Sequence, residues 1–256
     1  MKEYLTEIAK KNKLIYNFLK KSGLIFLLSK VYFFKIFDFA RKDYCTKNST
    51  RCEYDIKNKH YKYTLLGKDS PTCCLTHLYE IIRDITNVLN EANIDYFIMY
   101  GTLLGQMRHS QTFIPWDTDV DIVIMDIDKK KAVKVLSDEL STKYNLLASD
   151  AILKINYSKT NHLHADIYFW KEENEVLIDS LNDYWIKNRV KHEDVFPVIF
   201  SKLYDLDIKI PHNSEKVLKD IYGQNCLQVA LKKYAFKQER AEDFPHGKIN
   251  LNDLEG

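Results

Sequence analysis

Two aspartates, Asp119 and Asp121, stand at alternate positions where an apolar run begins, and this spacing predicts metal-dependent phosphate chemistry. The run Val120–Met125 is typical of a buried strand, and residues two apart on a strand project from the same face. Two carboxylates so close together resist ionising unless a cation neutralises them. Hard divalent ions bind carboxylate oxygens and usually keep positions open for substrate phosphates. We therefore expect a Mg²⁺ or Mn²⁺ site here.

The segment before the aspartates has the features of a phosphate-binding turn. Gly101 and Thr102 follow an expected strand and precede a short helix predicted over Leu103–Arg108. A glycine lets the backbone approach a phosphate closely, and a helix N-terminus offers N–H groups to an anion. Arg108 could bind a pyrophosphate with two parallel hydrogen bonds, or it could simply be solvated. Trp116 either stacks on a base or supports the turn.

A site for two metal ions needs a carboxylate from a second strand. Asp166, which leads into the apolar run Ile167–Trp170, is the candidate, although it could also be an ordinary aspartate at a strand end. Two divalent ions roughly 3.5–4 Å apart would clamp the attacking and leaving oxygens of an in-line displacement. His162 and His164 stand close by. Either could hold a phosphate or orient Asp166, although a lone histidine is more often structural.

One motif runs through the glycine turn and the aspartate pair, at Gly101, Thr102, Leu103, Leu104, Gly105, Arg108, Phe113, Ile114, Pro115, Trp116, Asp117, Asp119 and Asp121. It resembles the LicD/fukutin family, a branch of the nucleotidyltransferase superfold whose members move a phosphorylated alcohol from a CDP carrier onto a glycan. Thr118 departs from the pattern, because bacterial members often carry another Asp there. The resemblance implies Asp119, Asp121 and Asp166 as catalytic metal ligands. We expect substrate contacts from Gly101, Thr102, Arg108, Trp116, Asp117 and His164.

A second series of residues extends this resemblance towards the C-terminus. Family members carry an F-P pair, then I-P, then L-x-x-x-Y-G, which stand here at Phe196-Pro197, Ile210-Pro211 and Leu218 to Gly223. The likeness then covers residues 75–225. By residue type alone, these positions are typical of a core and of turns, and they add no catalytic group.

Four cysteines precede the expected catalytic core. Four thiolates can enclose a tetrahedral Zn²⁺, which would stabilise a loop without regular structure. The spacing resembles the zinc loop of the fukutin-related branch of the family. Disulfides or reduced thiols are the alternatives, and His60 or His77 could replace a ligand. The four are Cys45, Cys52, Cys73 and Cys74.

Charge is distributed unevenly along the chain. Residues 1–42 hold ten basic and three acidic side chains, a balance of +7, whereas the whole chain carries only +2. The rest is therefore acidic overall, which argues against a nucleic-acid partner. The basic and apolar residues of this N-terminal segment predict an amphipathic helix that lies at a membrane surface or else packs on the core. We expect a cytoplasmic protein, peripheral to a membrane, or one held at a Golgi or secretory membrane if residues 24–39 act as an anchor.

Apolar periodicity predicts an α/β (α+β) fold in which helices flank a mixed central sheet. This arrangement fits the nucleotidyltransferase-like core that the resemblance implies. The expected parts are a basic segment over 1–42, a Cys-rich loop over 43–74 that lacks regular structure, and a catalytic domain over 75–256. Asp128 is placed to cap a helix predicted over Lys129–Leu140. The predicted helices are Cys74–Glu91, Lys129–Leu140 and Ser214–Tyr222, and the predicted strands are Tyr96–Tyr100, Val120–Met125, Ala151–Tyr157, Ala165–Trp170 and Glu175–Leu181.

We interpret the chain as a metal-dependent enzyme that transfers ribitol 5-phosphate or phosphocholine from a CDP-linked donor to a glycan and releases CMP. Polar residues near the expected site favour CDP-ribitol, with CDP-choline next, because a polyol needs several hydrogen-bonding partners. Transfer of a nucleoside monophosphate from a triphosphate and a non-catalytic glycan-binding or scaffold role are the alternatives. The polar residues are Asn156, Lys159, Asn161 and His162.

Overall fold

The computed structural model describes residues 46–48, 54–55, 60–61, 68–179, 190–232, 237–240, 247–251 and 254. All of them belong to one compact unit, Tyr44–Gly256. Residues 1–42, Cys45 and Cys52 lie outside the described residues, and so does the predicted N-terminal helix. Among the helices of the described part, none has the length and apolar character needed to cross a membrane.

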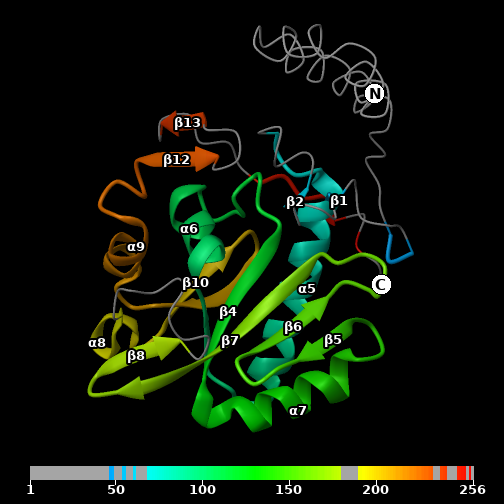
Figure 1. The fold of residues 1–256 in the computed structure, drawn as a ribbon, viewed down its shortest axis with the longest axis horizontal. Coiled ribbons are helices and arrows are strands. Elements are labelled where there is room, and N and C mark those ends of the chain that lie inside the picture. The colour runs from blue at the N-terminus through cyan, green and yellow to red at the C-terminus, as the bar shows by residue number, and fades with distance from the viewer. Residues whose placement is uncertain are drawn as a thin grey trace, which may run out of the picture. The chain divides into compact units, whose positions relative to one another are not determined.

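A mixed seven-stranded sheet forms the core of the described fold (Figure 1), as predicted. Its main path runs β3-β4-β7-β6-β5, and β8 joins β7 to β9 at one end. β4 and β7 pair in parallel, whereas the other strand pairs are antiparallel. The strands are β3 (Tyr96–Ile98), β4 (Asp119–Met125), β5 (Asn145–Ala148), β6 (Ile152–Asn156), β7 (His164–Glu173), β8 (Val176–Asp179) and β9 (Val190–Lys191).

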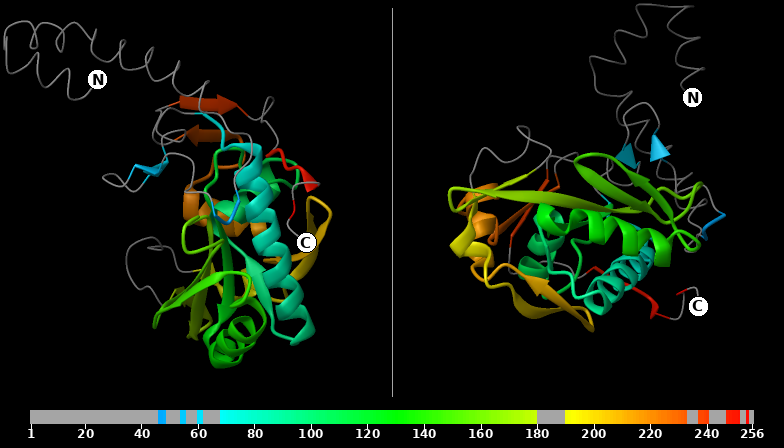
Figure 2. Two further views of the ribbon diagram at one scale, coloured as in Figure 1. Left: turned by 90° about the vertical axis from the view of Figure 1, so that its right-hand side faces the viewer. Right: turned by 90° about the horizontal axis from the view of Figure 1, so that it is seen from below.

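The two faces of the sheet differ in chemistry because side chains alternate along each strand. On β4, Val120, Ile122 and Ile124 are fully buried, and they alternate with Asp119 and Asp121. The helices α5 (Thr72–Glu91) and α7 (Lys129–Leu140) contact each other and β4. Both lie on the same side of the sheet (Figure 2), which leaves the opposite face for polar residues.

The helices follow the apolar periodicity of the sequence closely. α5 begins directly after Pro71, and residues such as Leu78, Ile82 and Ile85 repeat at helical spacing and are fully buried. α7 has the predicted bounds, but Asp128 forms no side-chain cap, so that detail was wrong. α9 (Ser214–Tyr222) also matches its prediction. α6 (Tyr100–Arg108) begins earlier than expected, directly after β3.

Several short elements were not anticipated. In the segment predicted to lack regular structure, β1 and β2 form an antiparallel pair, so the prediction was wrong there. β8 ends at Asp179, and the remainder of its predicted range is not described. The additional elements are β1 (Tyr54–Asp55), β2 (His60–Tyr61), η1 (Asp126–Asp128), α8 (His192–Val195), β10 (Ile199–Leu203), β11 (Leu206–Ile210), β12 (Val229–Lys232) and β13 (Lys237–Arg240).

Candidate active site

The parallel pairing of β4 with β7 gathers the predicted carboxylates. Its register places Asp119 opposite His164 and Asp121 opposite Asp166, so the four side chains share one face of the sheet. His164 Nε2 lies 3.9 Å from Asp119 Oδ2 and 3.6 Å from Asp166 Oδ2. One ligand atom from each of Asp119, His164 and Asp166 falls within 4.8 Å of the others. This spacing suits a divalent cation.

Asp121 is held by the turn that precedes α6. The Gly101 N–H donates to Asp121 Oδ2 at 3.1 Å, and the Tyr168 hydroxyl donates to Oδ1 at 3.3 Å. The Asp121 backbone N–H donates to Thr102 Oγ1 at 2.8 Å. Burial, followed by the charges of nearby aspartates, raises the pKa of Asp121 well above its usual value. A bound cation would favour its ionised form.

Asp117, a half-buried residue, adds another carboxylate to the same region. Its pKa is raised well above the ordinary value, first by burial and then by Asp119. The Thr118 N–H donates to Oδ1 at 3.2 Å, whereas Oδ2 accepts no hydrogen bond from the described residues. A buried carboxylate oxygen without a donor is costly, and a cation would satisfy it. The donor set at this site therefore fits a metal.

Asp166 differs electrostatically from Asp121 and Asp117. Burial opposes its ionisation, but His164 and Lys154 outweigh that effect and hold the pKa of Asp166 below its usual value. Lys154 stands opposite Asp166 on the antiparallel strand β6, and its Nζ lies 2.8 Å from Asp166 Oδ1. The sequence analysis missed Lys154. The signal was a lysine inside an apolar strand, but its partner depends on the strand register.

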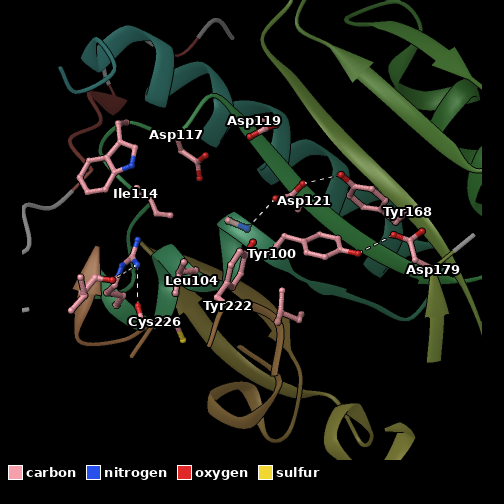
Figure 3. Close-up of a pocket in the computed structure, with 15 residues that line it drawn as sticks. Tyr100, Leu104, Ile114, Asp117, Asp119, Asp121, Tyr168, Asp179, Tyr222 and Cys226 are labelled. Atoms are coloured by element: carbon pink, nitrogen blue, oxygen red, sulfur yellow. Dashed lines mark hydrogen bonds between the residues drawn. The ribbon is translucent and has the colours of Figure 1, made fainter. Parts of the chain in front are cut away.

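A cavity of about 850 Å³ adjoins the carboxylates, and its size is typical of ligand pockets. Asp117, Asp119 and Asp121 line its middle (Figure 3), with Tyr168 and Asp179 towards one end and Ile114 and Cys226 towards the other. Asp119 also belongs to the group with His164 and Asp166, so this carboxylate joins the cavity to the predicted metal ligands.

Residues 93–213 match the model of the LicD/FKTN/FKRP nucleotidyltransferase domain. This match places the nucleotidyltransferase domain of the chain in the LicD/fukutin family. The chain is 28% identical over 195 residues to the Mus musculus protein named ribitol 5-phosphate transferase FKRP, covering 72% of the chain and 39% of that protein. It is also 37% identical over 60 residues to the Haemophilus influenzae lipopolysaccharide cholinephosphotransferase LicD, covering 23% of the chain and 22% of that protein.

The match confirms both the predicted family and the predicted nucleotidyltransferase-like core. The aligned residues span well under half the length of each of these two relatives, 39% of one and 22% of the other.

Arg108 of the LicD-family motif lines the cavity, but it also bonds to the chain beyond α9. Its Nη1 donates to the carbonyl oxygens of Cys226 at 3.0 Å and Val229 at 3.3 Å. Burial lowers the pKa of Arg108 to about 10. Arg108 therefore anchors this segment at the cavity, and its predicted contact with a pyrophosphate stays a prediction. Trp116 also lines the cavity, where its ring meets His109 edge-on at 5.5 Å.

The other end of the cavity contains a tyrosine–aspartate pair that the sequence did not reveal. The Tyr100 hydroxyl donates to Asp179 Oδ2 at 2.9 Å, and the ring meets Tyr168 edge-on at 5.1 Å. Tyr100 has a φ of 49°, which is uncommon for a residue other than glycine. Such conformations cluster at functional sites. Asp179 lies on β8, far from the motif in sequence, so only the fold brings it here.

Two of the predicted zinc ligands occur in the described structure. Cys73 and Cys74 lie in the first turn of α5 and are fully buried. His77, one turn further along, stacks on Tyr157 with ring centroids 4.2 Å apart. Because Cys45 and Cys52 lie outside the described residues, the zinc site stays a prediction.

Proposed function

We propose that this chain transfers a phosphorylated alcohol from a CDP-linked donor to a glycan hydroxyl and releases CMP. The observation that carries the proposal is the convergence of Asp119, Asp121 and Asp166 on one face of the sheet, next to a cavity large enough for a nucleotide derivative. The names of two relatives support it, since one is a ribitol 5-phosphate transferase and the other a cholinephosphotransferase.

A divalent metal, Mg²⁺ or Mn²⁺, belongs to this proposal because the carboxylates fit one. Asp119, Asp121 and Asp166 would hold it. The buried Oδ2 of Asp117, which accepts no hydrogen bond from the described residues, would also be stabilised by a nearby positive charge. When bound, such an ion would neutralise charge on the transferring phosphate and favour the alkoxide of the attacking hydroxyl. Asp166, whose Oδ1 lies 2.8 Å from the Lys154 ammonium, is suited to accept a hydrogen bond from that hydroxyl.

Gly101 and Thr102 act in this proposal by orienting Asp121. Both were expected to contact substrate, but their polar groups bond to Asp121 in the structure. Because Gly101 has no Cβ, the space beside Asp117 and Asp121 stays open, since a Cβ there would lie 3.2 Å from Asp117 Oδ2. Fixed carboxylates contribute to catalysis because they need not reorganise during the reaction.

We favour ribitol 5-phosphate as the transferred group, although the residues first used to argue for it do not support it. Asn156, Asn161 and His162 bond to neighbouring backbone carbonyls, and none of them lines the cavity. The support comes instead from Tyr100 and Asp179, which offer hydrogen-bonding groups to a polyol. The Mus musculus relative, whose match covers 72% of this chain, is also named a ribitol 5-phosphate transferase.

The test is product analysis with the full chain, a sugar acceptor and Mg²⁺ or Mn²⁺. We expect CMP release that is fastest with CDP-ribitol, slower with CDP-choline and abolished by chelation. Faster turnover of CDP-choline would overturn the choice of alcohol. Pyrophosphate released from a nucleoside triphosphate would instead show a nucleotidyltransferase. If no donor yields a product, the non-catalytic alternative gains support.

Two further features belong to the proposed protein as a whole. We propose a structural Zn²⁺ held by Cys45, Cys52, Cys73 and Cys74. We also propose that residues 1–42 contact an anionic membrane surface from the cytoplasmic side, because their charge balance is +7.

A further inference from the structure

We propose that His164 is a direct metal ligand through Nε2, and that this nitrogen makes the site prefer Mn²⁺ over Mg²⁺. The inference rests on the proposed metal-dependent function and assigns to His164 a role different from the substrate contact expected from the sequence.

The tautomer of His164 is set by its backbone partner. Nδ1 lies 2.9 Å from the carbonyl oxygen of His162. A carbonyl oxygen can only accept a hydrogen bond, so Nδ1 must carry the proton. The neutral ring therefore has its lone pair on Nε2, the nitrogen that faces the carboxylates. Metal-bound histidines usually show this arrangement, in which the second ring nitrogen donates to a carbonyl or carboxylate.

The gaps around Nε2 match the space that an ion would occupy. Nε2 lies 3.6 Å from Asp166 Oδ2 and 3.9 Å from Asp119 Oδ2, and both separations are too long for hydrogen bonds. Atoms that bind one ion at about 2.0–2.2 Å stand about 3–4 Å from one another. An ion placed between the three atoms would thus satisfy all of them with little movement.

Lys154 determines which oxygen of Asp166 is available. Its Nζ contacts Oδ1 at 2.8 Å, whereas Oδ2 is the atom nearest to His164. Asp166 would then bind an ion through Oδ2 alone. Asp119 supplies the second carboxylate and also lines the cavity, so the ion would lie at the edge of the cavity.

A set of carboxylates that also includes one imidazole discriminates between metals. Mg²⁺ prefers oxygen ligands and dehydrates reluctantly, so an imidazole in place of a water or carboxylate disfavours it. Mn²⁺ accepts oxygen ligands as Mg²⁺ does and also belongs to the transition series, whose members bind imidazole nitrogen. His164 therefore favours Mn²⁺ in a site that would otherwise consist of oxygen alone.

The experiment measures metal binding to the full chain without donor or acceptor. Pulsed EPR of the Mn²⁺-loaded wild-type protein should show a directly coordinated ¹⁴N, and this signal should vanish in His164→Gln. Titrations should show Mn²⁺ affinity falling by at least about tenfold in that variant, with a smaller change for Mg²⁺. His162→Gln is the matched control, because only the backbone carbonyl of His162 supports the proposed ligand, and it should retain both signal and affinity.

A second variant protects the test against misfolding. His164→Asp supplies an oxygen ligand in the same place, and we expect it to bind both metals with a lower ratio of Mn²⁺ to Mg²⁺ affinity. Absence of the nitrogen signal in the wild type, its persistence in His164→Gln, or equal losses for both metals would overturn the role of His164. These outcomes are independent of CMP release, so a chain that failed to transfer a phospho-alcohol could still bind Mn²⁺ through His164.

Discussion

Gly101 donates its backbone N–H to Asp121 Oδ2 at 3.1 Å, so the turn that opens α6 is tied directly to the second carboxylate of β4. The two residues belong to different halves of the family motif. Their contact explains why a glycine turn and an aspartate pair occur together, since the turn both orients the carboxylate and leaves the space beside it open.

A methyl group at Gly101 should therefore damage activity more than stability. In Gly101→Ala the added Cβ would lie 3.2 Å from Asp117 Oδ2 and 3.5 Å from Asp121 Oδ2. We expect CMP release to fall at least about tenfold, because small displacements of reacting groups are costly. The free energy of unfolding should stay within about 1 kcal/mol of wild type, because alanine favours the helix.

Gly105→Ala is the contrasting variant on the same helix. Its Cβ would lie 2.8 Å from the Ile114 nitrogen and 2.8 Å from the Thr112 carbonyl oxygen, and backbone atoms cannot easily move aside. Urea denaturation should show a loss of about 1–3 kcal/mol. The opposite result for Gly101→Ala, a loss of stability with activity retained, would show that the open space beside the carboxylates is not needed for catalysis.

Neutralising the predicted metal ligands should abolish transfer without unfolding the protein. We expect Asp119→Asn, Asp121→Asn and Asp166→Asn each to lower CMP release by at least about 100-fold, because each removes a charge that holds the cation. Asp126→Asn, just beyond the far end of β4, is the matched control. Steady-state rates at saturating metal decide the question, and normal turnover in any of the three would exclude that residue from the site.

Glu80 predicts a pH dependence of stability that is separate from catalysis. It is fully buried on α5, and its Oε1 lies 2.7 Å from Lys143 Nζ. Burial opposes its ionisation, but His77 and Lys143 outweigh that effect and lower the pKa of Glu80 from 4.5 to about 2. Because the folded-state pKa is the lower one, this stabilisation is present above pH 4.5 and disappears as the pH falls towards 2.

Glu80→Gln should therefore lower the free energy of unfolding at pH 7 by about 2–3 kcal/mol. The difference from wild type should shrink between pH 4.5 and 2, the interval between the two pKa values. Denaturation curves across this range measure it, with Glu139→Gln on the exposed surface of α7 as the control. A difference that stayed constant with pH would show that Glu80 contributes through packing alone.

The zinc proposal makes a stoichiometric prediction. Reduced protein purified without chelators should carry about one Zn²⁺ per chain, and serine at Cys45, Cys52, Cys73 or Cys74 should lower both zinc content and melting temperature, because metal binding is coupled to folding. Cys226→Ser should leave the zinc content unchanged. Elemental analysis that found no zinc in wild-type protein would reject the site.

Residues 1–42 should bind anionic vesicles but not neutral ones. Their +7 balance predicts attraction to phosphatidylserine that weakens as salt screens it. Flotation of the full chain at low and high salt measures this binding. Replacing Lys10, Lys13, Lys20 and Lys21 with Gln should release the protein. An intact chain that stays unbound at low salt would instead support a helix packed on the core.

Sequence reasoning succeeded for the longer helices and strands, whose apolar patterns are clear. The alternation through Asp119 and Asp121 identified β4, and helical spacing identified α5 and α7. It failed where contacts depend on the register between distant strands. The pairing of Lys154 with Asp166 and of Tyr100 with Asp179 depends on how β6, β7 and β8 align, which no local pattern encodes.

The parallel pairing of β4 with β7 also bears on how the protein folds. Strands that pair in parallel need a crossover connection, and here residues 126–163, which include α7, β5 and β6, form it. Such non-local contacts form slowly, because the entropy of closing the chain is lost before they stabilise it. Asp119 and Asp166 therefore come together only when β4 and β7 have paired. A cation that bridges them would bind the folded chain alone, and its concentration would shift the folding equilibrium of the entire sheet.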